Sequence, residues 1–233
     1  MATTGSVTEY GRGVTAHRGA SGERPENTLA AFAAAVQLGV DWLECDAHLT
    51  ADGHVVVIHD GRTGRTGDVD LAVAETSLAE LRAVDAAAQF RERRGLSVEQ
   101  CGKHTIPLLS EVLELVMQTS DDVRLSVQPK ADCVAQIWAV VCATGIDQHR
   151  IGFNDSSLEY MSQARQLAPA ATIFWDRVWG HPAGPPLASN QLEEDLAIAT
   201  EQGFNCLVLH KGGCSAEAVA TIHRAGEPRS CQL

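Results

Sequence analysis

Short apolar runs alternate along the chain with segments that carry apolar residues at helical spacing. The runs that predict strands lie at 14–16, 40–43, 55–58, 124–127, 150–153, 172–175 and 206–209. The segments that predict helices lie at 29–36, 77–84, 108–117, 133–142, 158–167, 192–200 and 216–223. Alternating strands and helices predict an α/β fold with a parallel sheet and crossover helices, and this many units predict a barrel.

Three segments depart from this alternation. Residues 61–70 are rich in Gly, Arg, Thr and Asp, which predicts a surface loop. Residues 89–103 are charged and aperiodic, so we expect a mobile excursion there. The tail 227–233 contains proline and arginine and has no apolar run long enough for a central strand.

Polar residues that could act in catalysis or bind a metal stand at the ends of the first apolar runs. His17 follows the run at 14–16, Glu44 and Asp46 follow the next, and His59 follows the run at 55–58. Side chains alternate faces along a strand, so the two carboxylates point the same way. Such a pair forms a hard-oxygen site suited to Mg²⁺ or Ca²⁺, whereas by itself a Glu-x-Asp is more often a solvated strand face.

Five ordered motifs resemble the glycerophosphodiester phosphodiesterase family. They are His17-Arg18-Gly19, Pro25-Glu26-Asn27-Thr28, Glu44-Cys45-Asp46, Asp52-Gly53 and His59-Asp60. The resemblance continues more weakly to about residue 226 and implies a TIM-type (β/α) barrel occupying residues 1–233 as one domain. It also implies an enzyme that uses a metal to hydrolyse glycerophosphodiesters to an alcohol and glycerol 3-phosphate.

The resemblance suggests a role for each polar residue. His17 and His59 become the catalytic acid–base pair, with His17 as base and His59 as acid, although the reverse assignment stays open. Arg18 and Lys130 would bind the phosphate oxygens, whose negative charge grows in the transition state. Asn27 or Thr28 would cap the first helix, and Glu26 and Asn27 would fix the loop and that helix end rather than touch the substrate.

The expected metal ligands are Glu44, Asp46 and Gln128. The family usually carries a third acidic ligand where this chain has Gln128. An amide oxygen can still coordinate a cation, but the site loses one negative charge, so we expect weaker metal binding.

Composition narrows the functional classes. With 233 residues and 45% hydrophobic content, the chain can bury one good core. A net charge of −12 argues against a nucleic-acid groove and an anionic membrane surface. We find no apolar run of membrane-span length and no secretory signal, and the seven scattered cysteines predict reduced thiols, so we expect a cytoplasmic protein with a small-molecule substrate.

A second departure concerns the end of the barrel. The family carries two further strands where this chain has the tail 227–233, which leaves about six barrel strands. We therefore expect an incomplete barrel that is marginally stable and has impaired activity. The rival functions are a related phospholipase acting on lysophospholipids and a non-catalytic barrel that binds phosphoesters. The sequence leaves the headgroup, the choice of metal and the oligomeric state open.

Overall fold

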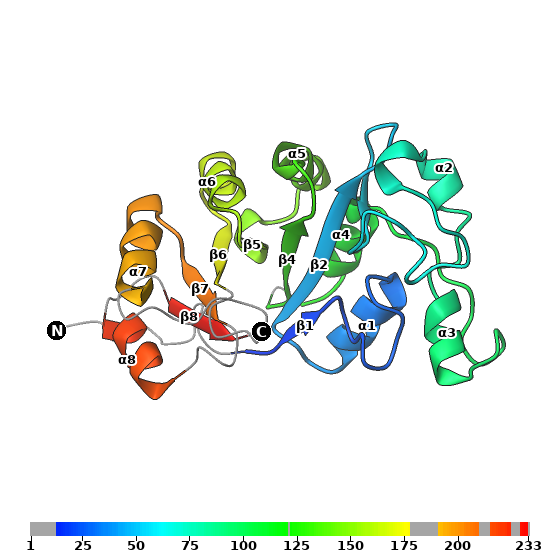
Figure 1. Ribbon diagram of the computed structural model, residues 1–233, viewed down its shortest axis with the longest axis horizontal. Helices are drawn as coiled ribbons and strands as arrows, with labels where there is room; N and C mark the ends of the chain where they lie inside the picture. The colour runs from blue at the N-terminus through cyan, green and yellow to red at the C-terminus, as the bar shows by residue number, and fades with distance from the viewer. Residues whose placement is uncertain (1–12, 121, 178–190, 210–214, 225–228, 233) are drawn as a thin grey trace. The chain divides into compact units, whose positions relative to one another are not determined.

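The computed structural model describes residues 13–120, 122–177, 191–209, 215–224 and 229–232 (Figure 1). The chain divides into two compact units. The N-terminal unit is Thr15–Gly152, and the C-terminal unit is Phe153–Leu233 together with Met1–Val14. The assignment of residues 1–233 to one domain stays a prediction.

Three parallel strands form the sheet of the N-terminal unit, in the order β1 (Thr15–His17), β2 (Trp42–Leu49) and β4 (Arg124–Pro129). Strand β3 (Val55–Val57) pairs antiparallel with the end of β2. The register places residue 17 of β1 opposite residue 44 of β2, and residue 46 opposite residue 128 of β4. Polar residues from three strands are thus neighbours.

The helices of this unit are α1 (Leu29–Gln37), α2 (Leu78–Leu81), α3 (Ala88–Arg94), α4 (Leu109–Met117) and α5 (Val134–Thr144), with 3-10 turns η1 (Val73–Glu75) and η2 (Gln148–Arg150). Helix α1 begins after Thr28, whose hydroxyl accepts a hydrogen bond from the backbone N–H of Ala31 at 3.2 Å. Large apolar side chains of these helices and strands, such as Phe32, Leu43 and Leu125, are fully buried. The core therefore lies between the helices and the sheet and fixes the strand ends.

Residues 89–103 are not irregular throughout, because most of helix α3 lies in this segment. Helix α3 begins this segment, and its Phe90 packs against Cys101 in a small apolar cluster. Arg91 is also buried, because it pairs with the Asp85 carboxylate and donates to the carbonyl of Cys101 at 3.3 Å. Because Arg91 is charged but occupies a buried position of α3, the apolar periodicity that would predict this helix is absent from the sequence.

Strand β5 (Ile151–Asp155) begins in the N-terminal unit and ends in the C-terminal one. The C-terminal unit continues the alternation with α6 (Leu158–Leu167), β6 (Thr172–Arg177), α7 (Gln191–Gln202), β7 (Cys206–Leu209), α8 (Ala216–Arg224) and β8 (Arg229–Gln232). Strand β7 pairs in parallel with both β6 and β8. The strands and helices that the sequence predicts after residue 150 all form.

Strand β8 corrects the expectation that the tail 227–233 adds no strand. Its register with β7 places Cys231 opposite Val208. Parallel pairing uses backbone N–H and C=O groups, so a polar segment can extend an open sheet edge without an apolar run.

No helix in the described residues has both the length and the apolarity that a membrane span requires.

Candidate active site

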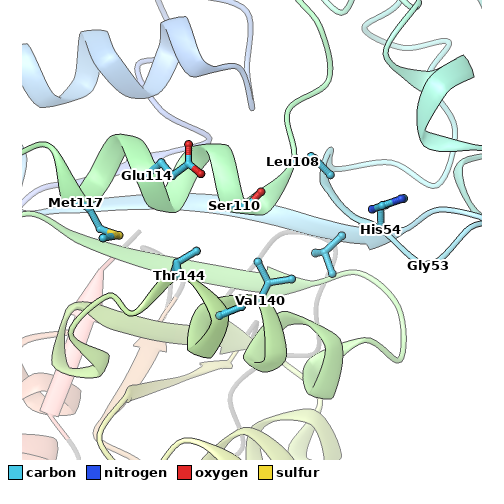
Figure 2. Close-up of a pocket in the computed structure, with 10 residues that line it drawn as sticks. Gly53, His54, Leu108, Ser110, Glu114, Met117, Val140 and Thr144 are labelled. Atoms are coloured by element: carbon cyan, nitrogen blue, oxygen red, sulfur yellow. The ribbon is translucent and has the colours of Figure 1, made fainter.

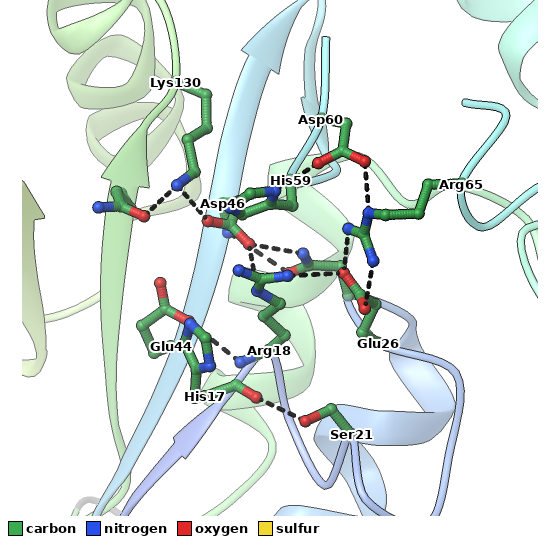
Figure 3. A network of polar contacts seen from close by, with 12 residues as sticks. His17, Arg18, Ser21, Glu26, Glu44, Asp46, His59, Asp60, Arg65 and Lys130 are labelled. Carbon is green, nitrogen blue, oxygen red and sulfur yellow. Dashed lines mark hydrogen bonds and ion pairs between the residues drawn. The ribbon is translucent and has the colours of Figure 1, made fainter. Parts of the chain in front are cut away.

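The candidate residues gather at the carboxyl ends of β1, β2 and β4 and in the loops beside them (Figure 3). His17 is the last residue of β1, and Arg18 follows it directly. Glu44 and Asp46 lie within β2, and Gln128 lies near the end of β4. In TIM-type folds this end of the sheet is where catalytic groups converge.

Glu44 and Asp46 form a carboxylate pair that is almost inaccessible to solvent, with exposures of 1% and 0%. Glu44 Oε2 accepts the backbone N–H of Arg18 at 3.0 Å. Glu44 Oε1 is buried and has no hydrogen-bond partner among the described residues. Burial and the neighbouring charge of Asp46 raise the pKa of Glu44 to about 8. A bound cation would relieve both effects.

Asp46 is surrounded by donors. Its Oδ2 accepts Asn27 Nδ2 at 2.7 Å and lies 3.2 Å from Arg18 Nε. Its Oδ1 lies 3.1 Å from Lys130 Nζ, which also donates to Gln128 Oε1. Lys130 therefore links the carboxylate of β2 to the amide of β4, and two cationic side chains offset the buried charge.

A chain of alternating charges connects Arg18 to His59. Arg18 donates to Glu26 Oε1 at 3.0 Å, and Arg65 binds both oxygens of Glu26 at 2.7 and 2.9 Å. Arg65 Nε also contacts Asp60, whose Oδ1 lies 2.5 Å from His59 Nδ1. Burial acts to raise the pKa of Glu26, but the hydrogen bonds from Arg65 and Arg18 outweigh it and lower that pKa to about 2. Glu26 is therefore a permanent anion.

The two histidines differ in their surroundings. The side chain of His17 is 53% exposed, and its Nε2 lies 3.9 Å from Glu44 Oε2. Burial of part of the ring and the charge of Arg18 lower the pKa of His17, which favours the neutral imidazole. His59 is held at Nδ1 by Asp60, whose Oδ1 orients the ring.

An unusual backbone shapes the loop between β1 and α1. Arg18 and Asn27 both have left-handed conformations, with φ of 58° and 56°, and Asn27 N donates to Arg18 O at 3.0 Å. Gly19 has φ of 77°, and a Cβ there would lie 2.7 Å from the carbonyl carbon of Ala31. Only glycine fits this close approach of the loop to helix α1.

The structure brings the seven expected site residues into one network of polar contacts in the N-terminal unit; their catalytic, binding and metal roles stay predictions. Sequence reasoning missed Arg65, which lies in the loop 61–70 and shows no periodic pattern. Of the two residues expected as the cap of the first helix, Thr28 caps α1, and Asn27 instead contacts Asp46. Glu26 does hold its loop, through Arg18 and Arg65.

The oxygen atoms of Glu44, Asp46 and Gln128 are the donors that Mg²⁺ or Ca²⁺ prefers, and the unpartnered Glu44 Oε1 fits such an ion. In the described residues, no three His, Cys, Asp or Glu side chains are clustered closely enough to hold a metal. The candidate set has only two acidic ligands, because its third member is the amide of Gln128.

A separate cavity of about 550 Å³ lies between α4 and α5, beside the turn that precedes β3 (Figure 2). Apolar residues such as Leu108, Met117 and Val140 line it, together with His54 and Glu114. None of the candidate residues borders it, so it is not part of the site.

The sequence model of the glycerophosphoryl diester phosphodiesterase family matches residues 17–178, more than half of the chain. A glycerophosphodiester phosphodiesterase from Bacillus altitudinis is 44% identical over 107 residues, which are 46% of this chain and 41% of that protein. Lysophospholipase D GDPD1 from Mus musculus is 40% identical over 112 residues, 48% of this chain and 35% of that protein. The matched segments thus span less than half the length of these relatives.

Among solved structures, an Oleispira antarctica phosphodiesterase in complex with the product sn-glycerol-3-phosphate superposes with a TM-score of 0.76 at 26% identity. The superposition covers 95% of this chain and 84% of that one. This likeness confirms the predicted α/β fold of TIM-barrel type.

Proposed function

The chain belongs to the glycerophosphoryl diester phosphodiesterase family, and on that premise we propose that it hydrolyses glycerophosphodiesters to an alcohol and glycerol 3-phosphate. The observation that carries the proposal is the convergence of two histidines, two cationic side chains and a buried carboxylate pair on one edge of the sheet (Figure 3). Hydrolysis of a phosphodiester needs positive groups around the non-bridging oxygens, a base for the attacking water and an acid for the departing ester oxygen, and this set supplies all three.

Arg18 and Lys130 bind the phosphate in this proposal. The side chain of each is about one-fifth exposed, so it can reach a ligand while Glu26 or Asp46 fixes its position. Arg18 offers a planar fork that matches two phosphate oxygens, whereas Lys130 offers a point charge. Both groups stabilise the negative charge that grows as the attacking oxygen adds.

Proton transfer falls to His17 and His59. His17 takes a proton from the attacking water at its imidazole nitrogen, because its lowered pKa keeps the ring neutral near pH 7. His59 gives a proton from Nε2 to the departing alkoxide, while Asp60 holds Nδ1. The net reaction consumes one water. His17 then releases the proton it gained and His59 takes one up from solvent, so both return to their starting protonation states.

A divalent cation, Mg²⁺ or Ca²⁺, is also part of the proposal, with Glu44, Asp46 and Gln128 as the ligands. When bound it would act as a Lewis acid that polarises a phosphoryl oxygen. Lys130 donates a hydrogen bond to Gln128 Oε1. If Lys130 turned to the substrate phosphate instead, this amide oxygen could bind the cation.

The test is turnover of glycerophosphocholine by the purified chain, with glycerol 3-phosphate measured by a coupled dehydrogenase. His17→Ala, His59→Ala and Glu44→Ala should each abolish turnover, whereas His149→Ala, at an exposed position of the same unit, should leave it unchanged. Full activity in excess EDTA would refute the metal part of the proposal alone.

A second candidate is hydrolysis of lysophospholipids, favoured by the similarity to the mouse lysophospholipase D. Lysophosphatidylcholine and glycerophosphocholine share a headgroup and differ in the acyl chain, so the ratio of their kcat/KM values separates the two activities. Saturable binding of both compounds with no turnover at saturating metal would instead support a non-catalytic phosphoester-binding protein.

A further inference from the structure

Arg65 is the point at which two parts of the site meet. It comes from the loop 61–70 between β3 and α2 and lies between two carboxylates (Figure 3). One is Glu26, which holds Arg18, and the other is Asp60, which holds His59. The side chain of Arg65 thus spans the groups assigned above to phosphate binding and to proton transfer.

Helix α3 supports this loop from behind. The backbone N–H of Gln89 donates to Thr66 O at 3.1 Å, and Arg93 donates to the carbonyl of Arg65 itself at 3.3 Å. Arg94 donates to the carbonyl of Gly22, in the loop that contains Glu26. Helix α3 therefore holds both the loop that contains Arg65 and the loop that contains Glu26.

We propose that Arg65 is a positioning residue that sets the spacing and orientation of Arg18 and His59 by bridging Glu26 and Asp60. This inference rests on the proposed function, since it assumes that these two side chains act on a phosphodiester. Arg65 itself need not touch the substrate.

The geometry of the bridge requires a guanidinium. Three nitrogens of Arg65 contact two different carboxylates, with the Glu26 contacts at 2.7 and 2.9 Å forming a bidentate pair. A lysine ammonium is a single point and can hold only one of them in the same orientation. Loss of the bridge would let Asp60 rotate and release the His59 ring, and displacements of about 1 Å can lower a rate about 100-fold.

The chain offers a matched control in Arg62. It lies in the same loop and forms an exposed bidentate pair with Asp70, with Nε 3.1 Å from Oδ1 and Nη2 2.9 Å from Oδ2. Arg65→Met and Arg62→Met remove the same charge from the same segment. We expect R65M to lower kcat about 10–100-fold and R62M to change it less than about twofold, since exposed ion pairs contribute little.

Double-mutant cycles identify the route of the effect. If Arg65 acts through Asp60, R65M should have little further effect on kcat in an Asp60→Asn background. Likewise, R65M should add little to the rise in KM caused by Glu26→Gln. R65K should recover only part of the lost kcat. Fully additive effects in both backgrounds, or an R65M enzyme that matches R62M in kcat and KM, would overturn the inference.

A spectroscopic measurement separates this inference from the proposed function. The ¹⁵N shifts of His59 report whether Nδ1 carries the hydrogen bonded to Asp60, and they require no substrate. R65M should shift these signals, and R62M should not. An inactive wild-type chain with R65M-dependent His59 signals would refute the function but keep the bridge, whereas unchanged His59 signals in R65M would refute the bridge.

Discussion

Asn27 gives the sharpest test of how the site is built, because it combines a left-handed backbone with a hydrogen bond to a buried anion. Its exposure is 4%, its φ is 56°, and its Nδ2 donates to Asp46 Oδ2 at 2.7 Å. A hydrogen bond to a charged group contributes about 1.5–3 kcal/mol. A left-handed residue other than Gly, Asn or Asp costs about 1–2 kcal/mol.

These two contributions can be separated by substitution. Asn27→Gly keeps the backbone conformation and removes the hydrogen bond, so it should lower the free energy of unfolding by about 1.5–3 kcal/mol. Asn27→Ala should lower it by about 1–2 kcal/mol more. Asn27→Asp keeps the shape but turns an anion toward Asp46, so activity should fall most in this variant.

The assay is urea denaturation followed by circular dichroism and tryptophan fluorescence, with turnover measured on the same samples. Equal stability of N27G and N27A would show that the backbone at this position is not strained. A glycine variant as stable as the wild type would show that the Asn27–Asp46 hydrogen bond contributes nothing.

Three further substitutions test other parts of the molecule. Gln128→Glu should tighten Mg²⁺ or Ca²⁺ binding in calorimetry by about 10–100-fold; unchanged affinity would show that Gln128 is not a ligand. Although burial acts to raise the pKa of Asp85, hydrogen bonds from Arg91 and backbone N–H groups lower it. The ionised Asp85 therefore stabilises the folded state fully above the unfolded pKa of about 3.9, and this stabilisation is lost as pH falls through the lower folded pKa. The difference in free energy of unfolding between the wild type and Asp85→Asn should shrink below about pH 4. Gly19→Ala should reduce stability by at least about 1–2 kcal/mol, because its Cβ would clash with Ala31 at φ of 77°; a wild-type melting temperature would contradict this.

Local signals in the sequence were enough to predict most of the fold. Helix α6 (Leu158–Leu167) has the predicted bounds, because Ser157 caps it and its apolar face follows the helical period. Helix α5 extends two residues beyond the predicted range and ends at Gly145 in the left-handed conformation, which glycine adopts without strain. The apolar runs predicted where the strands end, and these strand ends place His17 and the carboxylate pair at one edge of the sheet.

The errors share a physical cause, which is that polar contacts between distant segments leave no periodic pattern. Arg65 meets Glu26 across 39 positions of sequence, and neither residue lies in a periodic segment. Arg91 occupies a core position of α3 because Asp85 neutralises it, so the helix looks polar throughout. Strand β8 forms through backbone pairing, to which its side chains give no clue.

The order in which the polar network occurs along the chain has a consequence for synthesis on the ribosome. Every partner of Arg18, Asp46 and His59 described above lies between residues 17 and 65, except Lys130. At about 5–20 residues per second, Lys130 would be added roughly 3–13 s after Arg65. During that interval Asp46 lacks its ammonium partner, and β2 lacks its neighbour β4. The nascent chain therefore presents one unpaired edge of β2 and a carboxylate pair that lacks one of its two cationic partners, and this is the stage at which we expect chaperones to bind.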